Sequence, residues 1–314
     1  MRLVPLVALL WSGAALAAPP TPATDASAHP LAGAILRVAD GAEITPETLA
    51  AELGAADVAF LGEAHDNPEH HAAQAWLTAE IAPAALAFEM IGREREGTLS
   101  RLRAEGASRA ALGAALEWEN SGWPAWDLYA PILEAAPDAV VTGALIGREA
   151  SGAAMRDGAE AAGRAALGAA VARYGLAAPL AQAEAEAATA EQIGAHCGAL
   201  PADVAARMVE AQRLRDAALA DAALRGRALG DGGRVVVITG AGHARADRGA
   251  PRALAAAAPD LSVASLILAE VAEGREDWRD YGPGGRAGAD YIWFTAAAPR
   301  EDPCEAYLRA RAQP

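Results

Sequence analysis

The chain has 314 residues, 53% of them hydrophobic but only 5% aromatic, and its 41 acidic and 26 basic residues give a formal net charge of −15 at pH 7. Every basic residue is arginine, so P-loop nucleotide binding and lysine Schiff-base chemistry are excluded. A chain this acidic should repel nucleic acid and anionic lipid headgroups, so we expect no nucleic-acid partner.

Residues 1–17 have the pattern of a secretory signal peptide. Arg2 is followed by the apolar run Leu3–Leu10, and the small residues Ala15 and Ala17 fit a cleavage site. Residues 18–30 are rich in Pro, Thr and Ala and are expected to form a flexible leader. No later segment reaches the roughly 18 uninterrupted apolar residues of a membrane span, so no transmembrane segment is expected. Because no lipid-attachment cysteine lies near the signal, the sequence predicts a soluble periplasmic protein.

Strand-like and helix-like stretches alternate along the rest of the chain. This pattern predicts an α/β fold with a mostly parallel central sheet flanked by helices. One expected helix, Pro68–Ile81, has Asn67 as its N-cap and Pro68 at its first position, where the missing N–H costs nothing. The expected strands are residues 58–61, 84–88, 139–141, 234–239, 262–271 and 290–295.

Residues 149–229 contain many helix formers and no convincing strand. We therefore expect a helical insertion or lid within an α/β domain of residues 31–304, followed by a C-terminal tail of residues 305–314. Within the insertion, Arg213, Arg215 and Asp216 are interpreted as an ordinary solvated helix face. The only cysteines, Cys197 and Cys304, can pair in an oxidising compartment, but their distance is not visible in the sequence, which leaves the disulfide open.

Four ionisable side chains lie at the ends of expected strands: Glu63, His65, Glu89 and His243. In an open parallel sheet, ligands bind outside the carboxyl ends of the strands, so these side chains can meet in one pocket. A charged Glu at the end of a buried strand is costly unless it is paired, which makes Glu89 a site candidate. Carboxylates and imidazoles can hold a divalent metal or act as general acid and base.

Two further groups of residues are candidates near this edge of the sheet. His70 and His71 open the helix after the first motif and point about 100° apart, so at most one can face the pocket with His65. Trp118, Trp123, Trp126 and Tyr129 could line a flat apolar cofactor pocket, but packing beneath the loop is the favoured interpretation.

The motifs resemble those of the ChaN family of haem-binding proteins, which shares a superfamily with the Tiki metalloproteases and erythromycin-esterase-like enzymes. The matching motifs are Gly62-Glu63-x-His65-Asp66-Asn67-Pro68-x-His70-His71, Ala87-Phe88-Glu89-Met90 and Gly242-His243-x-Arg245-x-Asp247-x-Gly249-x-Pro251. The resemblance implies a parallel α/β core with a helical insert, and haem binding tied to iron uptake. It also implies that a tyrosine ligates the haem, for which Tyr129 is our choice, with His70 and His71 as further cofactor-binding candidates. The lipoprotein cysteine of many members is missing.

Two functions follow from these observations. The first is a periplasmic haem-binding protein, with a homodimer and an outer-membrane haem receptor as candidate partners. The second is a divalent-metal-dependent hydrolase, of esterase or protease type, in which Glu63, His65, Glu89 and His243 hold Mn, Co or Zn and carry catalysis. The residues slightly favour the hydrolase and the resemblance favours haem binding, so haem binding is the prediction and any enzymatic activity stays open.

Overall fold

A computed structural model describes residues 18–20, 28–281 and 288–312 of the chain. The signal peptide expected at residues 1–17, and residues 21–27 of the expected leader, lie outside these ranges. Eight strands form one sheet in the order β2-β1-β8-β7-β3-β6-β4-β5. The strands are β1 (Ile35–Arg37), β2 (Ala42–Glu43), β3 (Val58–Glu63), β4 (Ala85–Phe88), β5 (Val140–Gly143), β6 (Val235–Gly240), β7 (Val263–Glu270) and β8 (Tyr291–Thr295).

The six strands β3 to β8 run parallel, and β1 and β2 complete one edge of the sheet as an antiparallel pair. The predicted α/β fold with a mostly parallel sheet is therefore confirmed. The pair β1 and β2 was missed because strands of three and two residues contain no apolar run long enough to give a signal. The strand β3 lies between β6 and β7, and all six of its residues are buried because helices cover both faces of the sheet.

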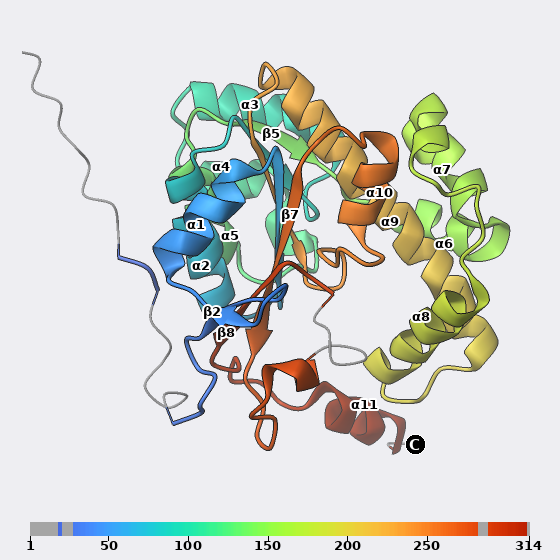
Figure 1. Cartoon of the computed structure of the whole chain (residues 1–314). Coiled ribbons are helices and arrows are strands. Elements are labelled where there is room, and N and C mark those ends of the chain that lie inside the picture. The colour runs from blue at the N-terminus through green and yellow to red at the C-terminus, as the bar shows by residue number, and fades with distance from the viewer. Residues whose placement is uncertain (1–17, 21–27, 282–287, 313–314) are drawn as a thin grey trace, which may run out of the picture.

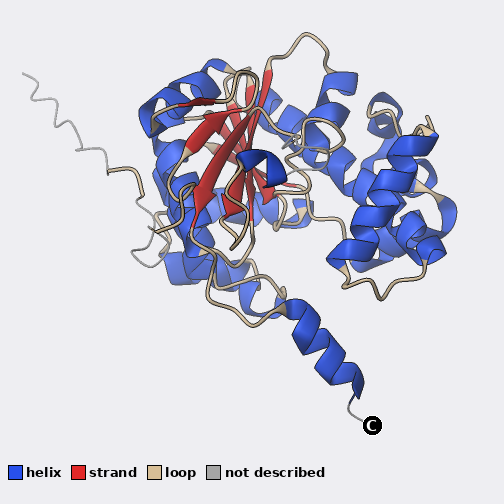
Figure 2. Cartoon of the chain, turned by 60° about the horizontal axis from the view of Figure 1, so that its bottom comes forward, coloured by secondary structure: helices blue, strands red, loops and turns tan. Residues whose placement is uncertain are grey.

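Helices cover both faces of the sheet (Figures 1 and 2). On one face, α1, α2 and α5 pack with Ala59 and Leu61 in one apolar cluster, whereas α9 and α10 pack with Val58 and Phe60 in another. Alternate residues of β3 thus pack into the helix layers on opposite faces of the sheet, because successive side chains of a strand point to opposite faces. The helices are α1 (Pro46–Ala55), α2 (Pro68–Ile81), α3 (Glu96–Ala104), α4 (Arg109–Ala115), α5 (Trp126–Ala135), α6 (Arg148–Asp157), α7 (Ala159–Leu167), α8 (Gln182–Ala195), α9 (Ala202–Leu229), α10 (Ala250–Ala257) and α11 (Pro303–Ala312).

Between β5 and β6 the chain forms the four helices α6 to α9, with α6, α7 and α8 lying to one side of the sheet (Figure 1). The long helix α9 connects this group of helices to the sheet, because it packs on α8 and also against β4 and β5. At Gly226, an added Cβ would lie 3.1 Å from the Cβ of Ala85 and 3.2 Å from Oγ1 of Thr142, so the absence of a side chain lets this helix approach the sheet. No helix in the described ranges is long and apolar enough to cross a membrane.

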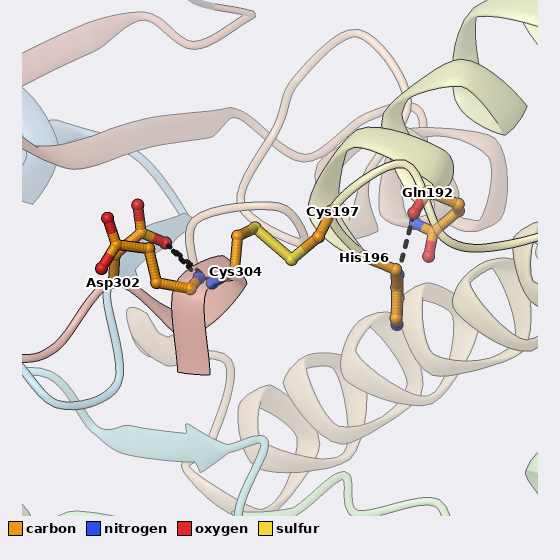
Figure 3. Close-up of a disulfide and its surroundings, with 6 residues drawn as sticks. Gln192, His196, Cys197, Asp302 and Cys304 are labelled. Atoms are coloured by element: carbon orange, nitrogen blue, oxygen red, sulfur yellow. Dashed lines mark hydrogen bonds between the residues drawn. A yellow bond between two sulfur atoms is a disulfide. The ribbon is translucent and has the colours of Figure 1, made fainter. Parts of the chain in front are cut away.

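Cys197 and Cys304 form a disulfide, with Cα atoms 5.3 Å apart (Figure 3). Cys197 lies in the turn between α8 and α9, and Cys304 lies in the first turn of α11. The bond closes a loop across 107 residues of sequence and ties the C-terminal end of α8 to the last helix. The pairing that the sequence left open is therefore present.

Candidate functional site

The carboxyl ends of β3, β6 and β4 lie side by side, and the candidate residues follow from these ends. Glu63 is the last residue of β3 and lies opposite Gly240 of β6, while Glu89 directly follows β4. His65 and His243 lie in the loops after β3 and β6. The structure brings Glu63, His65, Glu89 and His243 together at this one edge, as the following contacts describe.

Glu63 fixes the ring of His65. Nδ1–H of His65 donates to Oε1 of Glu63 over 2.9 Å, and the Glu63 side chain is fully buried. The His65 ring keeps about a third of its surface exposed and stacks edge-on against Trp123, with ring centroids 4.9 Å apart. Burial opposes the charged ring, but the bond to Glu63 and the nearby Glu89 carboxylate outweigh it and raise the pKa of His65. In the described structure, Nε2 of His65 forms no hydrogen bond.

Glu89 lies between the two histidines and is held by β6. Its Oε2 accepts hydrogen bonds from Oγ1 of Thr239 over 2.7 Å and from the backbone N–H of Gly240 over 2.8 Å. Burial disfavours the Glu89 carboxylate, but the His243 and His65 rings and these two donors prevail and lower its pKa. An added Cβ at Gly240 would lie 2.9 Å from Nε2 of His65 and 3.7 Å from Oε2 of Glu89, which explains why glycine ends this strand.

Asp216 of α9 completes the site. Nδ1–H of His243 donates to Oδ1 of Asp216 over 2.6 Å, and Nε2 of His243 lies 3.7 Å from Oε1 of Glu89. Burial acts against the charged His243 ring, but Glu89 and Asp216 outweigh it and raise the pKa of His243 to about 9. Burial also raises the pKa of Asp216.

The assignment of Asp216 to a solvated helix face was therefore wrong, since this side chain is buried. A sequence signal for its burial exists. Asp216 follows the buried Val209 by seven residues, or two helical turns, so both lie on the same face of α9. What the sequence cannot give is the partner, because His243 lies in the loop after β6 and meets Asp216 only in the folded chain.

His70 and His71 have different surroundings. His70 is fully buried and uses both ring nitrogens: Nδ1 accepts from the backbone N–H of Ala64 over 2.8 Å, and Nε2–H donates to Oγ1 of Thr295 over 2.8 Å. Burial lowers its pKa to about 3, so the ring stays neutral and joins the β3 loop to β8. Nε2–H of His71 donates to the carbonyl of His65 over 2.8 Å, and its Nδ1 lies 3.2 Å from Oε2 of Glu63. His71 thus supports the loop, whereas its Nδ1 and Oε2 of Glu63 are buried without a hydrogen-bond partner in the part of the chain that the structure describes.

Tyr129 contacts the site from beneath. Its hydroxyl donates to Oε1 of Glu63 over 3.0 Å, and its ring packs against His71 and Trp118. The residue is 0% exposed, and burial together with the Glu63 carboxylate raises the pKa of its phenol well above the ordinary value. Trp118 and Trp126 are buried as well, and each indole N–H donates to a backbone carbonyl. Trp118, Trp126 and Tyr129 are therefore packed in the interior, which is the interpretation that the sequence favoured for the aromatic cluster.

A pocket of about 110 Å³ opens beside His243. It lies between α8, α9 and the loop after β6, so the helical segment forms one wall and the strand edge the other. Its apolar lining includes Leu180, Ala188 and Val209. Its polar lining includes Glu184, Glu191, Gln192, Gln212, Arg213, Asp216, His243 and Arg248.

The donor set at this edge has the chemistry of a metal-facing or acid–base site. Each of the two imidazoles is oriented through Nδ1 by a carboxylate, Glu63 for His65 and Asp216 for His243, and Nε2 of His243 lies 3.7 Å from Oε1 of Glu89. Such carboxylate–imidazole pairs are how proteins orient histidines toward metals or reacting protons. As the side chains stand, no group of three or more His, Cys, Asp or Glu in the described ranges is arranged to hold a metal ion.

Comparisons with known proteins agree with this architecture. The family model described as haem-binding uptake, Tiki superfamily, ChaN matches residues 49–254, which contain all four candidate residues and the pocket. A solved structure described as cofacial haem binding to ChaN of Campylobacter jejuni superposes with a TM-score of 0.60 at 19% identity, covering 82% of this chain and 95% of that one. At this identity, the superposition supports a shared fold.

Two more distant structures also superpose. The type III effector HopBA1 gives a TM-score of 0.40 at 13% identity, covering 81% of this chain and 94% of that one. A variant of the erythromycin esterase EreC in its open conformation gives a TM-score of 0.38 at 14% identity, covering 85% and 83%. A comparison with curated protein sequences gave no match.

Proposed function

The chain belongs to the ChaN family of the Tiki superfamily, described as haem-binding uptake proteins, and from this premise we propose that it binds haem as a cargo for haem or iron handling. The observation that carries the proposal is the family match across residues 49–254. This range contains all three motifs at residues 62–71, 87–90 and 242–251, and also the pocket beside His243. The C. jejuni relative, described as binding haem cofacially, supports the same ligand.

The geometry favours His65, in place of Tyr129, as the ligand of the haem iron. An iron ligand needs an exposed donor atom with a free lone pair, and the partly exposed His65 ring has Nε2 without a hydrogen bond while Glu63 orients it through Nδ1. Tyr129 lacks both properties, because it is fully buried and its hydroxyl is bonded to Glu63. His70 is also disfavoured, since both of its ring nitrogens are already used.

The proposal places the protein in the periplasm. Its support is the signal-like start of the sequence together with the Cys197–Cys304 disulfide, since disulfides persist in oxidising compartments. An outer-membrane haem receptor and a second copy of the chain are the partners to test. Mass spectrometry of the N-terminus of protein recovered from the periplasm should show cleavage after Ala17, whereas retention of Met1 in the cytoplasm would contradict export.

Absorption spectroscopy and metal analysis of protein purified from the periplasm test the ligand. A Soret band with iron in proportion to protein supports haem binding. An absorption spectrum of micromolar haemin that the added protein leaves unchanged contradicts it.

One observation favours a second function, hydrolysis. The contact of Asp216 with Nδ1 of His243 over 2.6 Å, with Nε2 facing Glu89, is an acid–base arrangement of the kind that moves protons in ester cleavage. Turnover of simple aryl esters that is lost in both Glu89→Gln and His243→Asn would support this function, and equal background rates in all three proteins would remove it.

A further inference from the structure

Helix α8, which forms one wall of the pocket, is weakly anchored by apolar packing. Of its 14 residues only Ala188 is buried. The helix lies along α9, and its C-terminal end is tied to α11 by the disulfide (Figure 3). Few buried contacts mean that a segment can separate from the rest at low cost.

Ion pairs join α8 to the segment that follows β6. Glu184 of α8 pairs with Arg252 of α10, and Glu191 of α8 pairs with Arg248 and, over 3.1 Å, with Arg245. Glu184, Glu191 and Arg248 all line the pocket beside His243. These pairs therefore cross the pocket from one wall to the other and keep α8 over it; we call them the latch.

Arg248 is a poorly hydrated member of the latch. Its side chain is only 16% exposed, and burial lowers its pKa while Glu184 opposes this effect. A poorly hydrated guanidinium needs a carboxylate beside it, but any carboxylate can take that place. A ligand that brings its own carboxylates can thus replace the two glutamates without leaving a buried charge unpaired.

The pocket is too small for a large ligand while the latch is closed. Its volume of about 110 Å³ lies below the several hundred Å³ typical of sites for drug-sized molecules. A neighbouring pocket of about 240 Å³ shares Leu180, Arg213, Asp216 and Arg248 with it and also contains Arg252. Displacing Leu180 and the N-terminal end of α8 would join the two spaces into one cleft with apolar walls and arginines along its side.

We propose that α8 is a lid pivoting near Cys197, and that a flat apolar ligand with two carboxylates opens it by taking Arg248 and Arg252 from Glu191 and Glu184. The inference rests on the proposed function, because haem carries two propionate groups on an apolar ring. It adds that Arg248 and Arg252 bind the carboxylates of the ligand. It also adds that Glu184 and Glu191 compete with the ligand for these arginines.

The test is a haemin titration of the wild type and three variants, with protoporphyrin IX and its dimethyl ester as further probes. The double variant Arg248→Gln, Arg252→Gln should bind haemin at least about tenfold more weakly, since two charge-assisted contacts are lost. The double variant Glu184→Gln, Glu191→Gln should bind haemin about threefold or more tightly, because the competing carboxylates are gone. Arg207→Gln, which removes an exposed pair with Asp203 on α9, is the matched control and should bind as the wild type does.

The two porphyrin probes separate charge from shape. Wild type should prefer protoporphyrin IX over the dimethyl ester by at least about tenfold, and the arginine double variant should lose this preference. Haemin affinities within about twofold of wild type in both double variants would overturn the inference and leave haem binding intact. If wild type binds neither haemin nor protoporphyrin IX, the proposed function fails, and the inference fails with it. The glutamate variant keeps the test decisive if the arginine variant does not fold.

Discussion

The strand-edge site and helix α8 are built by opposite means. At the strand edge, Glu63 and Glu89 are buried and their oxygens accept bonds from His65, Tyr129, Thr239 and the backbone of Gly240. Across the pocket, α8 buries one residue and is held by ion pairs to arginines. The first arrangement holds side chains in fixed positions, and the second gives the pocket a wall with little buried apolar contact, which our proposal treats as a lid.

The largest difference should appear in stability. Phe60→Ala removes a fully buried ring of β3 and should reduce the free energy of unfolding by about 3–5 kcal/mol. Leu180→Ala, in the half-buried wall near α8, should cost less than about 1.5 kcal/mol. Guanidinium unfolding with the disulfide intact measures both, and Phe60→Leu, which keeps most of the volume, serves as the control. Equal losses of unfolding free energy in the two alanine variants would contradict the contrast between the sheet and the wall near α8.

The buried charges should give stability a pH dependence. In the folded chain, the pKa of His243 is raised from the ordinary histidine value to about 9. Burial and Arg215 act against the charged ring, but Glu89 and Asp216 outweigh them. His65 also lies close to Glu89. The folded state therefore binds the His243 proton more tightly than the unfolded state does. This contribution is complete below about pH 6.5 and is lost as pH rises through 9, which lowers the free energy of unfolding by on the order of 2–3 kcal/mol.

Unfolding experiments at intervals from pH 6 to pH 10 measure this slope. His243→Gln cannot titrate and should be less stable at pH 6 but lose much less stability on the way to pH 10. A wild-type profile that is flat or rises between pH 7 and pH 9 would mean that His243 is not held as a cation.

The smallest effect on stability should come from the latch. Arg252→Gln removes a partly exposed ion pair with Glu184 and should cost less than about 1 kcal/mol in global unfolding. Cleavage of the chain around α8 by a protease should nevertheless become faster, because local opening requires less free energy than global unfolding. Arg164→Gln, which removes an exposed pair with Glu160 on α7, is the matched control and should leave the cleavage rate unchanged. Cleavage at the wild-type rate in Arg252→Gln would show that the pair does not hold α8.

The sequence predicted the strand edge well because its signals are local. The apolar runs before Glu63, Glu89 and Gly240 are buried on both faces of the sheet, and a parallel sheet brings the ends of such strands to one edge. The helix Pro68–Ile81 with its Asn67 cap is confirmed, since the cap accepts from the backbone N–H groups of Glu69 and His70. These features depend on neighbours in sequence or on strand order.

Features that depend on distant partners could not be predicted in the same way. Asp216 meets His243 across 27 residues, and Glu184 meets Arg252 across 68, so neither contact leaves a local pattern. The burial of Tyr129 depends on how α5 packs on α2, which the sequence does not specify. For the same reason, the sequence did not show that Tyr129, chosen as haem ligand from the family resemblance, lies beneath the site with its hydroxyl bonded to Glu63.

The most direct test of haem binding is a haemin titration followed by absorption spectroscopy of the wild type, His65→Ala and Tyr129→Phe. The account predicts micromolar or tighter binding by the wild type with a Soret band, a changed spectrum and weaker binding in His65→Ala, and a nearly unchanged spectrum in Tyr129→Phe. Charge-transfer bands that vanish only in Tyr129→Phe would return the ligand to that tyrosine. A haemin spectrum that the wild type leaves unchanged would contradict the central claim.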